Sequence, residues 1–574
     1  MTLDQETMPM TPPVPKIPGN RPHQAWRIPR FRYLNKIPLV LVLTLVAILY
    51  GVNLAGYPEF VNDDEGTYFA QAWAVVNEGS VAHYTYWYDH PPVGWIQLAL
   101  LLRPLQWIWG GDGVPVETAG RGMMTLLAVI SAALVYKIAR NIGLPRLVAL
   151  AAPLVWTLSP ITVAYGRQIY LDNIALAWLL ACFALVTGKP KLQYHVAAGC
   201  AFGMAVLSKE TAAVALPAIL AALWMFAWAR TRAFSFVGFL GTGALLVGGW
   251  LLFAAVKNEL LPGPGHVSLW DTITWQLYGR GSAGFMFTGG TSANAILNEW
   301  LGQDPYLIIA GMLLCFVGLF FRQSRVIALV PVLYLLVALR GGYIPAMYII
   351  TPLPFFALIV VYLAWKLWHA VNFRFRKTFK WAARTGVAIV VAASVITVAP
   401  SWAAASIRAV TENQNSPYQE ALAYVDANLP RNTTVLTDDN AWNDLVAMGW
   451  SADGWSGPLW QFKLDRDPIA REKHLPGSWK DIDYIFLGRG MEIFVGGGIL
   501  SQEEAPLAHA ALAHSKLVKA WGPVGSQVRL LKVDPNMDPV DPEWMRAHPD
   551  QAPTASLGPA AQGAAAPSPG SPSE

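Results

Sequence analysis

Long apolar runs recur through the first two-thirds of the chain and constrain its fold more than any other feature. A helix of about twenty apolar residues spans the hydrocarbon core of a bilayer. About eleven runs approach or reach that length, at residues 39–57, 121–138, 147–164, 173–187, 194–208, 211–228, 234–256, 305–321, 326–340, 344–365 and 386–402. With 54% hydrophobic and 14% charged residues, the sequence predicts a mainly α-helical polytopic membrane protein and excludes a soluble multidomain one.

Lysine and arginine are concentrated in every second loop between these runs. The basic loops lie at residues 27–36, 137–146, 189–191, 230–232, 322–325 and 366–384. Because basic residues favour cytoplasmic flanks, the pattern predicts a cytoplasmic N-terminus and an extracytoplasmic C-terminal part. We expect a multi-pass integral protein of the plasma (inner) membrane. The first run reads as a retained span and not as a cleaved signal peptide.

Composition divides the chain into four regions. Residues 1–36 form a basic cytoplasmic tail, and residues 37–405 form the transmembrane domain, with a long external loop at 58–120. Residues 406–534 are polar, with a helical pattern at 417–428, strand patterns at 434–437 and 484–487, and a hairpin pattern within 517–533. A small α/β domain outside the membrane is expected there. Residues 535–574 are rich in proline, alanine and serine, which predicts disorder.

Acidic residues gather in the first external loop, directly after the first apolar run. Asp63, Asp64 and Glu65 are consecutive, and Asp89 follows. Asn62 or Asp63 is a typical helix N-cap, and apolar residues 69, 72, 73 and 76 recur at helical spacing up to a stop at Gly79. These signals predict an amphipathic interfacial helix with carboxylates at its start. Prolines 91 and 92 are placed to begin the next apolar helix.

Two short elements of this loop resemble a known family. Asp64, Glu65 and Tyr68 form a D-E-x-x-Y element, and Asp89 begins an acid-x-Pro-Pro element. This pair resembles the first external loop of the GT-C membrane glycosyltransferases, most closely the branch of protein O-mannosyltransferases and the aminoarabinose transferase of lipid A (family 39-like). The resemblance implies a GT-C fold over roughly the first 400 residues. By analogy, Asp64 is the general base and Asp89 orients the acceptor or ligates a metal.

Further residues are candidates for substrate or phosphate binding. They lie in the external loops or turns and carry charge or a hydroxyl: Glu65, Tyr68, His90, Arg167, Asp172, Lys209, Arg280 and Tyr348. Each has a structural alternative. Glu65 can be solvated or cap a helix, Arg167 can pair with Asp172, Lys209 can be a snorkelling turn residue, and Tyr348 can be an interfacial tyrosine. His90 and Thr67 stand where the aminoarabinose branch has lysine and arginine, which leaves the sugar open.

The resulting hypothesis is a hexosyl- or pentosyltransferase that moves a sugar from a polyprenyl-phosphate-linked donor to an extracytoplasmic protein, lipid or cell-wall glycan. The sequence indicates no particular cofactor, and a divalent metal at Asp64 and Asp89 is left open. The sequence contains no P-loop, HExxH, GxSxG or Cys/His zinc spacing, and no nucleic-acid partner is expected. The alternatives are a transporter or flippase of lipid-linked sugars, and a non-catalytic scaffold.

Overall fold

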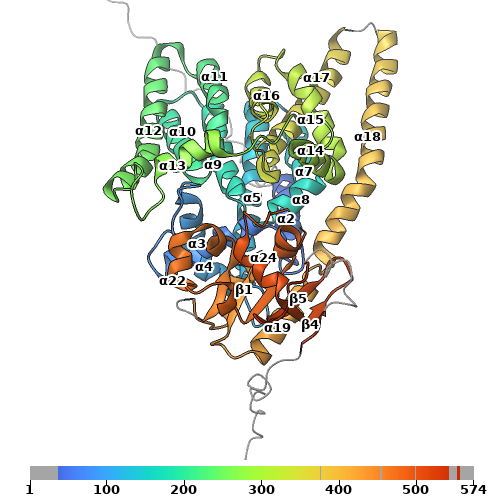
Figure 1. Ribbon diagram of the computed structural model, residues 1–574. Helices are drawn as coiled ribbons and strands as arrows, with labels where there is room; N and C mark the ends of the chain where they lie inside the picture. The colour runs from blue at the N-terminus through green and yellow to red at the C-terminus, as the bar shows by residue number, and fades with distance from the viewer. Residues whose placement is uncertain (1–35, 375–376, 453–455, 498, 542–552, 556–574) are drawn as a thin grey trace, which may run out of the picture.

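The computed structural model describes residues 36–374, 377–452, 456–497, 499–541 and 553–555. A layer of helices occupies one side of the molecule and a small sheet the other, with α3 and α4 between them (Figure 1). The predicted basic tail, apart from Lys36, and most of the predicted disordered tail lie outside the described residues. Residues 553–555 run beside the sheet, where the Leu517 amide donates to the Pro553 carbonyl at 2.7 Å.

Every predicted apolar run coincides largely with one, two or three consecutive helices. In chain order these are α2 (Ile37–Gly51), α5 (Glu117–Asn141), α6 to α8 (Arg146–Ala149, Ala151–Thr157, Pro160–Gly166), α9 (Leu171–Val186), α10 (Leu192–Ser208), η1 with α11 (Glu210–Ala215, Leu216–Phe226), η2 with α12 (Ala229–Thr231, Arg232–Val256), α15 (Pro305–Gly318), α16 (Arg325–Leu339), η4 with α17 (Ala346–Ile350, Pro352–Arg374) and α18 (Lys377–Thr411). Apolar side chains remain exposed on the outer helices, for example Val237 on α12 and Ile396 on α18. Such exposure suits a lipid environment.

Length and composition mark fewer of these helices as membrane spans than the sequence predicts. Four are long and apolar enough, or up to six if each of two bent pairs is one span. Five shorter apolar helices of 10–17 residues accompany them. The bends follow Thr157 and Gln303, because Pro160 and Pro305 each begin a new helix there. The chain is therefore an apolar helical bundle whose broken and short helices lower the number of uninterrupted spans.

The first external segment contains both predicted helices. Asn62 caps α3 (Asp63–Asn77) by accepting from the Asp64 amide at 2.9 Å, and the chain turns after it at Gly79, whose φ is +64°. Helix α4 (Val93–Trp109) starts directly after the two prolines. The position of α3 at the membrane interface stays a prediction. Nearly all of α3 is buried or half-buried, because the C-terminal part covers the face that would otherwise meet water.

The C-terminal part is built on a five-stranded mixed sheet. Its order is β2-β1-β3-β5-β4, with β1 (Thr434–Thr437), β2 (Gly457–Trp460), β3 (Tyr484–Leu487), β4 (Ser515–Trp521) and β5 (Val528–Val533). Strand β1 is parallel to β2 and β3, whereas β5 is antiparallel to β3 and β4. The predicted strands, hairpin and helix α19 (Ser416–Asn428) are confirmed. Strand β2 was not predicted, because its Gly-Pro-Leu-Trp sequence lacks a strand pattern.

Further helices link and cover these elements. Between α12 and α15 lie α13 (Leu269–Thr274), the π-helical turn η3 (Trp275–Gly279) and α14 (Ser292–Gln303). Around the sheet lie α20 (Asp439–Ala447), α21 (Gln461–Arg466), α22 (Pro468–His474), η5 (Trp479–Asp481), α23 (Arg489–Met491), η6 (Glu492–Gly496) and α24 (Pro506–Ala513). Helix α20 packs directly on α3. The sheet part and the first external segment are thus one packed unit at the end of the helical bundle.

Candidate active site

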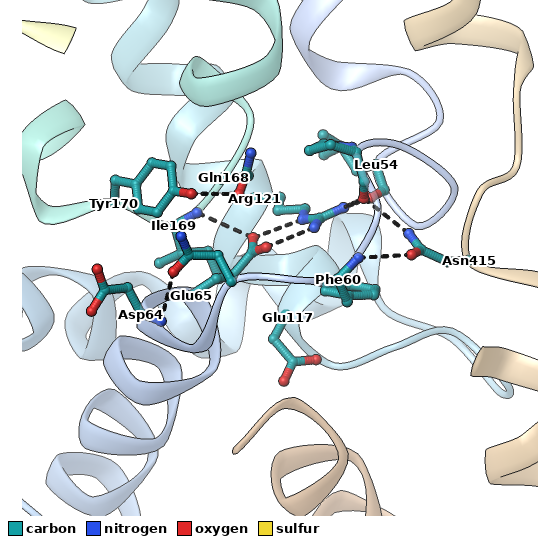
Figure 2. Close-up of polar contacts among 12 residues, drawn as sticks. Leu54, Phe60, Asp64, Glu65, Glu117, Arg121, Gln168, Ile169, Tyr170 and Asn415 are labelled. Carbon is teal, nitrogen blue, oxygen red and sulfur yellow. Dashed lines mark hydrogen bonds and ion pairs between the residues drawn. The ribbon is translucent and has the colours of Figure 1, made fainter. Parts of the chain in front are cut away.

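The three consecutive acids at the start of α3 point in different directions. The Asp64 carboxylate lies on the opposite side of the helix start from the Glu65 carboxylate (Figure 2). Consecutive helical residues are about 100° apart around the axis, so adjacent acids face different neighbours. Burial, followed by the charge of Asp64, raises the pKa of Asp63 to about 7. Helix geometry therefore separates the acids into distinct environments.

Glu65 is held in a closed ion pair. Its Oε1 and Oε2 accept from Nε and Nη2 of Arg121, both at 2.7 Å, and the Ile169 amide donates to Oε1 at 3.1 Å (Figure 2). Both side chains are fully buried, and Arg121 also donates to the carbonyls of Leu54 and Pro58. Glu65, a candidate substrate ligand, thus contacts protein groups. Arg121 was missed by sequence reasoning, although an arginine opening an apolar run requires a partner.

Lys209 is the centre of a second buried charge cluster. It lies between α10 and η1 and is only 4% exposed. Its Nζ lies 2.9 Å from His90 Nε2, 3.4 Å from the Tyr68 hydroxyl and 3.9 Å from Asp172 Oδ2. Glu210 Oε2 lies 3.0 Å from the other ring nitrogen of His90. The structure therefore brings four of the predicted residues together and shows that Lys209 does not snorkel toward solvent.

Asp64 and Asp89 both act electrostatically on this cluster. Burial lowers the pKa of Lys209, but the charges of Asp172, Glu210, Asp64 and Asp89 outweigh it and raise the pKa above its ordinary value. The D-E-x-x-Y element and the acid-x-Pro-Pro element of the first external loop thus each supply a carboxylate whose charge acts on the Lys209 ammonium. Glu210, the first residue of the short helix η1, also takes part, although the sequence analysis did not name it as a candidate.

Arg167 lies apart from Asp172. Its guanidinium donates to the carbonyls of Leu49, Val52 and Asn53, at the end of α2. Unpaired carbonyls at a helix C-terminus attract such a cation. The alternative of an Arg167–Asp172 pair is therefore wrong, since Asp172 faces Lys209 instead. Arg167 joins α2 to the turn before α9.

Arg280 and Tyr348 both pack against aromatic rings. The Arg280 guanidinium lies over the rings of Trp275 and Tyr343, 4.6 Å and 4.0 Å from their centroids. Burial, then the charge of Asp64, raises the pKa of Tyr343, which puts this aromatic pair within electrostatic reach of Asp64. Tyr348 is 7% exposed, and its ring packs 4.9 Å from that of Tyr334. Tyr348 is therefore a buried residue of the helical core.

Helix α20 of the C-terminal part closes over α3. Thr67 Oγ1 donates to Asp439 Oδ2 at 2.7 Å, and Asn443 Nδ2 donates to the Gly66 carbonyl at 2.9 Å. A Cβ atom at Gly66 would lie 2.7 Å from the Asn440 amide nitrogen and from Asp439 Oδ1. Glycine at this position therefore allows the two backbones to approach.

The described residues do not form a metal site of the usual composition. Among them, no three His, Cys, Asp or Glu side chains are grouped so that they could hold a metal ion. The charges of Asp64 and Asp89 act on the Lys209 ammonium, and that of Asp89 also acts on Lys463.

Comparison with known proteins places this geometry in a wider context. Residues 89–253 match the model of the dolichyl-phosphate-mannose-protein mannosyltransferase family. The match begins at Asp89 and includes His90, Asp172 and Lys209, whereas Asp64 lies before it. No curated protein matches the chain.

The fold resembles that of solved GT-C enzymes. The apo oligosaccharyltransferase of Archaeoglobus fulgidus shares 12% identity with a TM-score of 0.53, covering 90% of this chain and 76% of that one. The same enzyme tethered to an acceptor peptide shares 11% identity with a TM-score of 0.50, covering 87% of this chain and 74% of that one. ArnT of Cupriavidus metallidurans bound to undecaprenyl phosphate shares 13% identity with a TM-score of 0.45, covering 72% of this chain and 84% of that one. The chain has the fold of GT-C glycosyltransferases, which together with the family match confirms the predicted family resemblance. Within that class it carries a mannosyltransferase-like region.

Proposed function

We propose that this chain transfers a sugar from a polyprenyl-phosphate-linked donor to a hydroxyl group of an extracytoplasmic acceptor, with Asp64 as the general base. The observation that carries the proposal is the buried ammonium of Lys209, which lies 3.9 Å from Asp172 Oδ2 and whose pKa the charges of Asp64 and Asp89 help to raise. Acids and a cation at the end of an apolar bundle suit a lipid-borne phosphate and a polar acceptor. The mannosyltransferase-family match at residues 89–253 supports the donor class.

In this reaction the bond between sugar C1 and the phosphate oxygen breaks, while a bond forms between C1 and the acceptor oxygen. Asp64 takes the acceptor proton, and polyprenyl phosphate leaves with the electron pair. Asp89 orients the acceptor hydroxyl.

Lys209 is suited to stabilise the departing phosphate. Its 3.9 Å contact with Asp172 Oδ2 is longer than a hydrogen bond, and that oxygen accepts no hydrogen bond within the described part of the chain. The ammonium therefore keeps capacity for a further anion. His90 holds Lys209 from the other side at 2.9 Å.

The membrane arrangement is part of the proposal. We place about eleven spans, counting broken and short helices as spans, with the N-terminus cytoplasmic. The first external loop and residues 406–534 then share the extracytoplasmic side with the site. Charges gathered at one end of the bundle favour an enzyme over a flippase, which would hold charge near the bilayer midplane.

The test is sugar transfer by the full chain in lipid, using undecaprenyl-phosphate and dolichyl-phosphate sugars with hydroxyl-bearing peptides, lipids and glycans. Asp64→Asn should lower transfer by about 10²–10⁴-fold, and Asp89→Asn should also lower it. Binding of polyprenyl phosphate to Asp64→Asn should be unchanged. Asp112→Asn removes an exposed acid of the same segment and serves as the matched control.

Unchanged transfer in both variants would overturn the assignment of the site. Absence of transfer by the wild type, together with movement of the lipid-linked sugar across vesicle membranes, would favour the flippase.

A further inference from the structure

The segment that carries Asp89 is joined to the C-terminal part at consecutive residues. His83 Nε2 lies 3.1 Å from the Ala452 carbonyl oxygen, and the Tyr84 hydroxyl accepts from the Trp460 amide at 3.4 Å. The Thr85 carbonyl accepts from Lys463 Nζ at 3.0 Å. The partners are separated by 369 to 378 residues in sequence. The position of this segment therefore depends on the sheet part as well as on its own turn.

Lys463 makes the last of these contacts from α21. The side chain is 4% exposed, and its Nζ lies 3.6 Å from the centroid of the Trp87 ring, within cation–π range. The neighbouring Phe462 ring lies 5.9 Å from the same indole. The Trp87 carbonyl accepts a hydrogen bond from Thr272. Trp87, two residues before Asp89, is thus fixed by two other parts of the chain.

The Lys463 ammonium also faces carboxylates. Burial lowers the pKa of Lys463 to about 8, and the charges of Asp89 and Asp467 oppose that shift. Asp467 caps α22 by accepting from the amides of Ile469 and Ala470. Asp89 lies on the segment that Lys463 holds. One buried lysine therefore combines a backbone contact, an aromatic contact and a charge near Asp89.

We propose that Lys463 is a positioning residue through which the C-terminal part completes the active site, by holding residues 84–90 and setting the place of Asp89. This rests on the proposed function. Lys463 takes part in no bond-making step. Its position affects the rate of transfer, because a small displacement of a reacting group such as Asp89 lowers the rate even when every group is present.

The first experiment compares Lys463→Met with Lys463→Arg in the full chain in lipid. Lys463→Met should lower transfer by about 10- to 100-fold, and Lys463→Arg should restore most of it. Above pH 8 wild-type transfer should fall as Lys463 loses its proton, whereas Lys463→Arg should keep its rate. Lys480→Met is the matched control, since Lys480 also lies near a tryptophan, 5.9 Å from the Trp479 centroid, but is exposed.

The second experiment measures hydrogen exchange and needs no activity. Amides of residues 84–90 should exchange about tenfold faster in Lys463→Met, while those of β1 and β3 stay protected and show that the part is folded. Faster exchange supports the positioning role even if the wild type transfers no sugar, a result that would count only against the proposed function. Unchanged exchange, or a failure of Lys463→Arg to restore transfer where Lys463→Met lowers it, would overturn the proposal.

Discussion

The two buried charge centres next to α3 differ in how fully their hydrogen-bonding capacity is used. In the first, both oxygens of Glu65 accept from Arg121, which also donates to backbone carbonyls. In the second, Lys209 contacts His90 closely but Asp172 only at 3.9 Å. The first centre is fully buried, whereas the second is partly open, since the Glu210 side chain beside His90 is 41% exposed. A closed ion pair fixes structure, whereas an incomplete one retains capacity for a ligand.

The largest effect on stability is expected at the closed centre. Arg121→Met leaves the Glu65 carboxylate buried without its cation, which should destabilise the protein by about 3–5 kcal/mol. The thermal unfolding midpoint in detergent should fall accordingly. The double variant Arg121→Met with Glu65→Leu removes both charges and should recover much of the loss. An unchanged midpoint in Arg121→Met would show that this centre is not structural.

Removing the cation of the second centre should affect sugar transfer more than stability. Lys209→Met should lower transfer by about 10²–10³-fold, because the departing phosphate loses its cation. The unfolding midpoint should fall less than in Arg121→Met, since Asp172 makes only a long contact with Lys209.

Lys257→Met is the matched control for Lys209→Met, because Lys257 is exposed at the end of α12. The contrary result is a Lys209→Met variant that loses much stability while its folded fraction transfers sugar normally. That result would show that the Lys209 centre is structural, like the Glu65–Arg121 pair.

Local features of the fold could be predicted from the sequence, because they depend on neighbouring residues. The Asn62 cap and the strands at residues 434–437 and 484–487 have short-range causes, namely a capping oxygen and runs of β-forming residues. The candidate acids Asp64 and Asp89 were identified through a resemblance. Their shared neighbour Lys209 was named, but its contact with His90, 119 residues away, could not be derived.

Long-range partners account for what the sequence left undetermined. The Glu65–Arg121 pair joins residues 56 apart, and Lys463 reaches Thr85 from 378 residues away. No periodicity encodes such pairs, because they arise from how helices and sheet pack. Arg167 illustrates the same limit, since its sequence neighbour Asp172 is not its partner and the carbonyls of α2 are.

A third group of acids, between α3 and the sheet, extends the comparison to carboxylates without a cation. Mainly because of burial, the pKa of Asp438 is raised to about 6 and that of Asp444 to about 7, and the pKa of Asp439 is raised by burial and by Asp63. Glu65 is paired with an arginine, whereas burial shifts these three groups toward their protonated forms. Their charge therefore depends on pH.

The sign of the pH effect follows from the direction of these shifts. A carboxyl whose pKa is higher in the folded than in the unfolded state contributes stability that is complete below about pH 4 and is lost as the pH rises toward 7. Amides of α20, corrected for intrinsic exchange, should therefore open on the order of tenfold more readily at pH 7 than at pH 5, about 1.4 kcal/mol. Asp439→Asn keeps a hydrogen-bonding side chain near Thr67 and removes one titrating group. The opening of α20 should therefore change less with pH in this variant. Equal opening at both pH values would show that these acids stay ionised and that the interface tolerates their charge.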